Sequence, residues 1–344
     1  MSENKEYKFP VPIIDEREEK SLEELTKRYE KLIEPTKAVI LGEKAIEMIP
    51  SKIKNLGTNI KSSISEKDIY TKALKIALDG FKIIEEQAAK FTISEKTIIK
   101  QINKIESNNK IRKMDEICLV RGYDISKIVN KYKTQDVFAA MAEGGITGFA
   151  GFAGIPFNIA LSTFLYYRAV QSVAMFYGYD VKNDSAEMVI AGEVFMKAIS
   201  PQSSDINEMS TMISKIMIFT ESTTIRQTVS KSWSDMASKG GICLLIAQMR
   251  ALANKAAQKA LEKTGKKGLE KTIFTEVLGQ VGKKLTKNAV HKGMPYVSAV
   301  LGALIDTAQM KQVLDYADVF YNKRFILEKE DKLAILNSEI CIVE

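Results

Sequence analysis

Apolar residues recur at three- and four-residue spacing along most of the chain, and no segment alternates apolar and polar residues as a half-buried strand does. Leu25, Tyr29 and Leu32, for example, fall on one face of a helix. Ser21, with a glutamate three residues later, forms a capping-box pattern, so this helix is predicted to begin there. The pattern predicts an all-α protein, a multi-helix bundle. A second helix is predicted between Pro35 and Pro50, and further helices over residues 72–90, 94–108, 113–133, 158–177, 185–196, 209–239, 240–263, 275–290 and 296–327, with a break at 265–268. Gly178 is predicted to follow the C-terminus of the helix over 158–177, and Asp184 or Ser185 to cap the helix that ends at Met196.

Composition divides the chain into four parts. At 344 residues it is long enough to bury a sizeable core. Residues 1–18 are predicted to be a flexible tail, and 19–133 an N-terminal helical region rich in Lys and Glu. Near Thr134 glycine and small residues become frequent, so 134–330 is predicted to form a second helical unit, followed by a C-terminal tail over 331–344.

The 24 residues from Gly144 to Tyr167 carry no charged side chain. This run is longer than the roughly 18 apolar residues that raise the question of a membrane span. It is interrupted by proline, and glycine costs about 1 kcal/mol per helical position relative to alanine, so close packing must offset that cost. We therefore predict a tightly packed helical hairpin at the centre of the bundle, with insertion into or onto a bilayer as the alternative. The residues expected at its helix–helix contact are Gly144, Gly145, Gly148, Gly151, Gly154 and Pro156.

The same run carries a resemblance to a known family. The segment Gly144–Pro156, followed by Tyr167-Arg168 and by Tyr177-Gly-Tyr-Asp180, resembles the signature of the EcsC family. A second similar segment is Met294–Ala303, which precedes a predicted helix with Ala317-Asp-Val-Phe320 and the basic residues Lys323 and Arg324. The resemblance covers roughly residues 134–327. It implies an all-α bacterial protein of a family named for a protein encoded beside an ABC transporter, with no assigned biochemical activity.

Two positions depart from the family pattern. Asn158 stands where an acidic residue is usual, and Asp306 stands where an asparagine is usual. We predict that Asn158 and Asp306 face each other as a polar pair in the core, so that the two residue types are exchanged rather than lost. Two independent changes on helix surfaces are the alternative.

The net charge of +7 is concentrated between Lys239 and Lys292, where twelve Lys and Arg residues oppose three acidic residues. Lysines spaced by four residues line one helix face beside an alanine-rich apolar stripe. Such a face suits an anionic membrane surface, at about 1 kcal/mol per Lys or Arg near the lipid. A solvated helix face is the alternative, and the lack of interleaved aromatic residues argues against nucleic acid. The candidate head-group ligands are Lys255, Lys259, Lys263, Lys266 and Lys267.

Arg168 closes the uncharged run and is expected to point partly inward. A buried arginine needs a carboxylate partner, for which Glu143, Asp180 and Glu187 are the candidates. An anion or a lipid phosphate is the alternative partner of Arg168.

Candidate catalytic groups are scarce. His291 is the only histidine, and it stands in a lysine-rich segment expected to be exposed, so we predict no Ser-His-Asp or Cys-His catalysis. Cys118, Cys243 and Cys341 are far apart, which gives no metal or disulfide pattern and favours a reducing compartment. The charged N-terminus has no apolar signal segment. We therefore expect no metal, no cofactor and a cytoplasmic location.

Together these features favour a non-enzymatic protein that associates peripherally with the inner face of the cytoplasmic membrane, or with a membrane complex of transporter type. Two other functions stay open. One is a hydrolase-like enzyme with a pocket lined by Arg168, Asp180 and Asp306. The other is an effector that perturbs membranes by inserting the hairpin.

Overall fold

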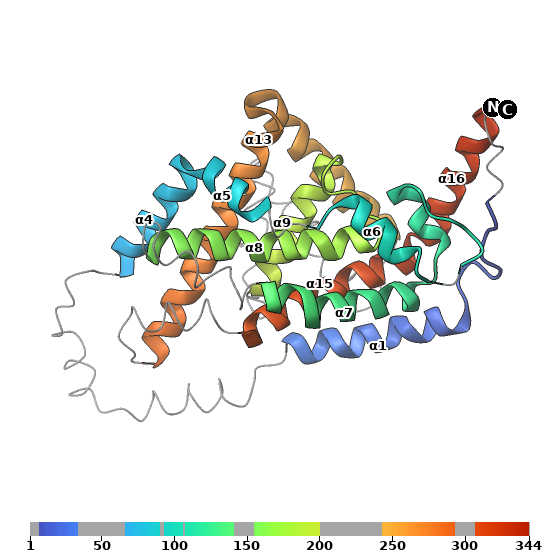
Figure 1. Ribbon diagram of the computed structural model, residues 1–344, viewed down its shortest axis with the longest axis horizontal. Coiled ribbons are helices and arrows are strands. Elements are labelled where there is room, and N and C mark those ends of the chain that lie inside the picture. The colour runs from blue at the N-terminus through green and yellow to red at the C-terminus, as the bar shows by residue number, and fades with distance from the viewer. Residues whose placement is uncertain are drawn as a thin grey trace.

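All regular secondary structure in the described part of the chain is helical, which confirms the predicted all-α class (Figure 1). The computed structural model describes residues 7–33, 66–89, 93–105, 107–140, 155–199, 243–292 and 307–343. Its elements are α1 (Glu16–Ile33), α4 (Glu66–Asp79), α5 (Phe81–Ala89), α6 (Glu95–Ile102), the 3-10 helix η1 (Met114–Leu119), α7 (Gly122–Ala140), α8 (Ile155–Phe176), α9 (Ser185–Ile199), α13 (Cys243–Lys292), α15 (Thr307–Leu327) and α16 (Lys329–Val343).

Helix α8 lies at the centre of the molecule. It packs against α4, α5, α7, α9, α13 and α15, and its residues are buried on every side because the sequence is apolar all round. Phe164 anchors one cluster, with its ring 5.6 Å from that of Phe81 and 4.9 Å from that of Phe274. From Ile159 to Tyr167 the uncharged run is therefore core, apart from half-buried Tyr166. The five glycines 144–154, the side chain of Asn158 and the whole of Asp306 lie outside the described residues, and so do the predicted hairpin and polar pair.

Helix α1 begins at Glu16, five residues before the predicted cap, so the prediction for Ser21 is wrong. The amide of Glu18 donates to Asp15 Oδ1 at 2.8 Å, and the amide of Asp15 donates back to Glu18 Oε2 at 3.4 Å. This reciprocal pair is the capping box, placed one helical turn and a half earlier than expected. Ser21 instead donates its hydroxyl to the carbonyl of Arg17 at 2.8 Å. Residues 16–18, expected in a flexible tail, are thus helical.

Glycines end or divide several helices. Gly178 follows α8 with φ +79°, as the sequence predicted for a residue just beyond a helix C-terminus. Gly265 has φ +67° inside α13 and bends it, at the predicted break. Gly80 separates α4 from α5, where a single helix was expected. The predicted helix over 113–133 is a 3-10 helix followed by α7, because the chain is extended at Val120.

Segments from both ends of the chain share one core. Figure 1 shows α1 and α7 side by side, with α15 behind them, and α1 packs on both. Helix α16 occupies most of the segment expected to be a C-terminal tail, and its Leu333 and Leu336 are buried. Within the described ranges, no helix combines the length and the apolar character that crossing a bilayer requires.

Candidate functional site

The candidate lysines gather where α13 bends. We call Lys255, Lys259, Lys263, Lys266 and Lys267 the basic bend; in Figure 1 the bend of α13 stands at the top of the molecule. All of these lysines are exposed except Lys259, which is half-buried. The neighbouring apolar stripe does not face outward: Ala253, Ala256 and Ala260 are buried against the core, where α13 packs on α9. The bend therefore presents charge without an accompanying apolar face.

Arg168 has a carboxylate partner, but not one of those predicted. Its Nη2 lies 2.7 Å from Glu270 Oε1, and its Nη1 donates to Gln171 at 2.9 Å. Helix α13 crosses α8 and brings Glu270 over Arg168, a contact that spacing along the sequence does not indicate. Burial is the main reason that the pKa of the Glu270 carboxyl is raised, with the nearby Arg168 opposing the rise.

The predicted partners of Arg168 are engaged elsewhere where the structure describes them. Asp180 Oδ1 accepts the amides of Lys182 and Asn183, both at 3.1 Å, within its own turn. Glu187 binds other arginines, and Glu143 lies outside the described residues. Asp180 borders a cleft that Arg168 does not line, so the pocket expected for an enzyme is not formed by these two residues.

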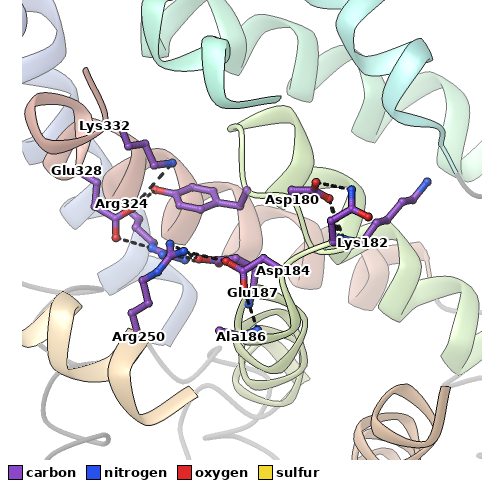
Figure 2. Close-up of polar contacts among 11 residues, drawn as sticks. Asp180, Lys182, Asp184, Ala186, Glu187, Arg250, Arg324, Glu328 and Lys332 are labelled. Carbon is purple, nitrogen blue, oxygen red and sulfur yellow. Dashed lines mark hydrogen bonds and ion pairs between the residues drawn. The ribbon is translucent and has the colours of Figure 1, made fainter. Parts of the chain in front are cut away.

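That cleft, of about 740 Å³, opens between the turn after α8, the start of α9, α13 and the junction of α15 with α16. Ile335 and Leu336 of α16 give the cleft an apolar part, whereas Asp331 and Lys332 of the same helix and the floor of the cleft are charged. The polar residues that form the floor and rim are Tyr179, Asp184, Glu187, Arg250, Glu328 and Lys332 (Figure 2).

Glu187 is the centre of the charged floor. Fully buried Arg324 binds it through two hydrogen bonds, Nη1 to Oε2 at 2.7 Å and Nη2 to Oε1 at 2.8 Å. Figure 2 shows Arg250 of α13 reaching the same group, with Nη1 2.9 Å from Glu187 Oε1 and Nη2 2.8 Å from Asp184 Oδ2. Asp184, one of the two predicted caps, also caps α9 by accepting the amide of Ala186 at 2.9 Å. These pairs join α9, α13 and α15 by charge-assisted hydrogen bonds.

Tyr179 of the family-like Tyr177–Asp180 segment is held between two cations. The guanidinium of Arg324 lies 4.1 Å from its ring centre and the ammonium of Lys332 lies 3.5 Å from it. Its hydroxyl donates to Glu328 at 3.0 Å, and Glu328 accepts the Nε–H of Arg324 at 2.8 Å. Desolvation lowers the pKa of the Lys332 amine to about 8, against the attraction of Glu328. Burial alone would raise the pKa of Glu328, but Arg324 and Lys332 hold it below its ordinary value.

A second buried network surrounds Asp318 of α15. Its carboxylate accepts Arg28 Nη2 at 2.8 Å, Lys133 Nζ at 3.0 Å and the hydroxyl of Tyr177 at 2.7 Å. Burial opposes ionisation of Asp318, but Lys133 and Arg28 outweigh it, so the pKa of this carboxyl is lowered. The network fastens α1, α7 and the end of α8 to α15.

A third network closes on Glu18, which is buried in α1. It accepts Lys329 Nζ at 2.6 Å, Arg121 Nη1 at 2.9 Å and the amide of Gly122 at 2.8 Å. Lys329 is the first residue of α16, so residues more than three hundred positions apart are paired directly. All three networks are individually satisfied, as structural ion pairs are.

The sequence missed most of these residues. Arg324 and the segment around Asp318 were singled out only for their resemblance to a family, and Glu328 and Lys332 gave no signal because isolated charges on helices resemble a solvated surface. Among the residues that the structure describes, no group of His, Cys, Asp and Glu is arranged to hold a metal ion.

Comparison with known proteins identifies a family. A family model described as the EcsC protein family matches residues 14–326. The match begins well before Thr134, so it includes the N-terminal helices in which no resemblance was detected. No curated protein and no solved structure shows a significant match to the chain.

Proposed function

The chain belongs to the EcsC family, and we propose that this member associates peripherally with an anionic membrane surface through its basic bend. The surface would be the inner face of the cytoplasmic membrane, either lipid alone or lipid beside a membrane complex of transporter type. The observation that carries the proposal is the exposure of four of the five lysines at the bend of α13, with the adjacent alanines buried in the protein.

Because the alanine stripe is buried in the protein, the attraction is electrostatic rather than due to insertion of an apolar helix face. Each lysine near an anionic bilayer contributes about 1 kcal/mol. This attraction extends over a screening length of about 8 Å at physiological ionic strength and is weakened by added salt. Exposed Glu262 lies in the same stretch and offsets part of the charge. We therefore expect reversible binding that depends on salt.

The test is flotation of the whole protein with vesicles of phosphatidylcholine, with and without phosphatidylglycerol. We expect binding only to the anionic vesicles and release at high salt. Replacing three lysines, in Lys263→Gln/Lys266→Gln/Lys267→Gln, is expected to weaken binding about a hundredfold, since three contributions of about 1 kcal/mol are lost.

A matched control removes the same charge from another surface. Lys96, Lys100 and Lys104 are exposed on or just after α6, and their replacement by glutamine should leave binding within about threefold of the wild type, because distant exposed charges are screened. Recovery of the wild-type protein in the soluble fraction with both vesicle types would refute the proposal. Equal losses of vesicle binding in the two triple variants would also refute it. Release of a dye trapped in the vesicles would indicate membrane perturbation instead of surface binding.

A further inference from the structure

The amine of Lys332, on α16, lines the charged cleft without a hydrogen bond to hold it (Figure 2). Its Nζ lies 3.5 Å from the centre of the Tyr179 ring, and the carboxylate oxygen beside it, Glu328 Oε2, is 4.0 Å away. That separation is too long for a hydrogen bond, and no described residue accepts one from Nζ. Only 21% of the side chain is exposed, so the amine is largely desolvated but can be reached from the cleft.

The surroundings of Lys332 favour the neutral amine. Desolvation lowers its pKa to about 8, and the nearby Arg324 of α15 adds to this effect. Glu328, Glu187 of α9 and Cys118 of η1 oppose it. At pH 7 this pKa leaves about a tenth of the amine without its proton, compared with roughly 0.03% for an ordinary lysine. A neutral amine has a free electron pair, which makes desolvated lysines effective nucleophiles.

A lowered pKa by itself does not make a lysine accessible to a ligand. The pKa of Lys323 is also lowered to about 8, but this residue is fully buried and its Nζ donates to Thr26 Oγ1 at 2.8 Å. The pKa of half-buried Lys197 is again about 8, and this residue does not line the cleft. Lys332 therefore differs from these two lysines in its position, which combines a neutral amine with an open cavity.

The rest of the cleft indicates which molecules can reach this amine. Six carboxylates and two cations line it, and one of these cations, Arg250, is already paired with Asp184 and Glu187, so the cleft repels anions. Ile335 and Leu336 lie three and four residues after Lys332, on the same helix face, and Ile335 is 60% exposed. The volume of about 740 Å³ is within the range of sites for small molecules. The six carboxylates belong to Asp115, Asp180, Asp184, Glu187, Glu328 and Asp331.

We propose that Lys332 forms an imine with a neutral, apolar aldehyde that enters the cleft. The electron pair of Nζ forms a bond to the carbonyl carbon, and the electrons of the C=O π bond move to the oxygen. This oxygen then leaves as water with the two hydrogens of the amine, and a carbon–nitrogen double bond remains, so no oxidant or reductant is needed. Glu328 is within reach of Nζ through one water molecule and carries protons from the nitrogen to the oxygen.

The test is reductive trapping on the whole protein. The protein is mixed with hexanal at pH 7, sodium cyanoborohydride supplies hydride to the imine carbon, and the labelled lysines are located by peptide mass spectrometry. We expect Lys332 to react at least about tenfold faster than the exposed Lys96 and Lys100 of α6, because more of its amine is neutral. Glyoxylate is an aldehyde that carries a carboxylate. Relative to the same two exposed lysines, it should label Lys332 at least about tenfold less than hexanal does.

Two variants test the amine and the cleft separately. Lys332→Arg keeps a cation beside Tyr179 but has no nucleophilic amine, so the whole protein should lose one fast-reacting equivalent. Ile335→Ser removes exposed apolar surface and should slow the labelling of Lys332 by hexanal at least about threefold. The matched control is Ile83→Ser, at a position of α5 that is 54% exposed and does not line the cleft, and it should leave this rate unchanged.

The proposal is overturned if Lys332 reacts with hexanal no faster than the exposed lysines, or if Lys332→Arg keeps every fast-reacting equivalent. Equal relative labelling of Lys332 by hexanal and glyoxylate would also overturn it, as would equal rates in Ile335→Ser and the wild type, because the cleft would then not select the aldehyde. The Lys263→Gln/Lys266→Gln/Lys267→Gln variant should be labelled normally at Lys332, so this test is independent of the membrane proposal.

Discussion

Replacing Glu187 by leucine is expected to destabilise the protein by about 3 kcal/mol, the lower end of the range for breaking a buried ion pair. The side chains of Arg324 and Glu187 are 0% and 2% exposed, so the variant leaves a guanidinium in the core without its two strongest hydrogen bonds. The lower end applies because Arg324 keeps Glu328 and Arg250 keeps Asp184. The loss is a large part of the 5 to 15 kcal/mol (roughly) that stabilises a typical domain.

A double variant distinguishes the cost of leaving a buried charge unpaired from the cost of changing the shape of the core. In Glu187→Leu/Arg324→Met no buried charge is stranded, because Glu328 still accepts the hydroxyl of Tyr179 and has Lys332 nearby. Apolar replacement of a whole buried pair is often neutral or stabilising, so the double variant should recover at least about half of the lost 3 kcal/mol.

The assay is urea unfolding followed by far-ultraviolet circular dichroism, with Glu86→Gln as the control. Glu86 forms an exposed pair with Lys82, at 3.8 Å, and its loss should cost less than about 0.5 kcal/mol. The reasoning fails if Glu187→Leu lowers the free energy of unfolding by less than about 1 kcal/mol, or if the double variant is no more stable than the single one.

Two further predictions concern stability. Alanine at Gly178 must adopt a backbone with φ +79°, at a cost of about 1 kcal/mol. Its Cβ would also lie 3.2 Å from both Ile117 Cβ and the Met114 carbonyl, so a loss of less than about 1 kcal/mol in urea unfolding would contradict the structure. The pKa of Lys332 is lowered to about 8, so the free energy of unfolding is predicted to rise as the pH is raised from 8 towards the ordinary pKa of lysine. In this pH range Lys332 keeps its proton in the unfolded chain but has released it in the folded protein. Urea midpoints at two pH values in this window should rise less in Lys332→Met than in the wild type, and an equal rise would show that Lys332 does not titrate there.

Local sequence signals predicted local structure well. Gly178 ends α8 and Asp184 caps α9 because backbone geometry and a short side chain decide these points within a few residues. The signals failed where two residues competed for one role, as when Asp15 rather than Ser21 capped α1. They also could not tell whether an apolar stripe is covered: spacing identified Ala253, Ala256 and Ala260 as one face, and only the fold shows that this face is buried in the protein.

The candidate site depended on contacts that spacing along the chain cannot indicate. Arg168 was expected to pair with a carboxylate nearby in sequence, yet its partner Glu270 is about a hundred residues away. Glu187 and Arg324 are separated by 137 positions. Their pairing depends on how α9 and α15 are rotated about their axes, which periodicity leaves undetermined once a helix is buried on more than one side.

The three buried networks restrict how the helices are rotated about their axes. Helix α8 is apolar all round, so its packing alone specifies only weakly how it is rotated about its axis. A buried carboxylate, in contrast, finds its cationic and hydrogen-bonding partners in only a few arrangements of the helices. Asp318 and Arg324, six residues apart on α15, each join this helix to elements from elsewhere in the chain. We infer that these pairs select which helices neighbour α15.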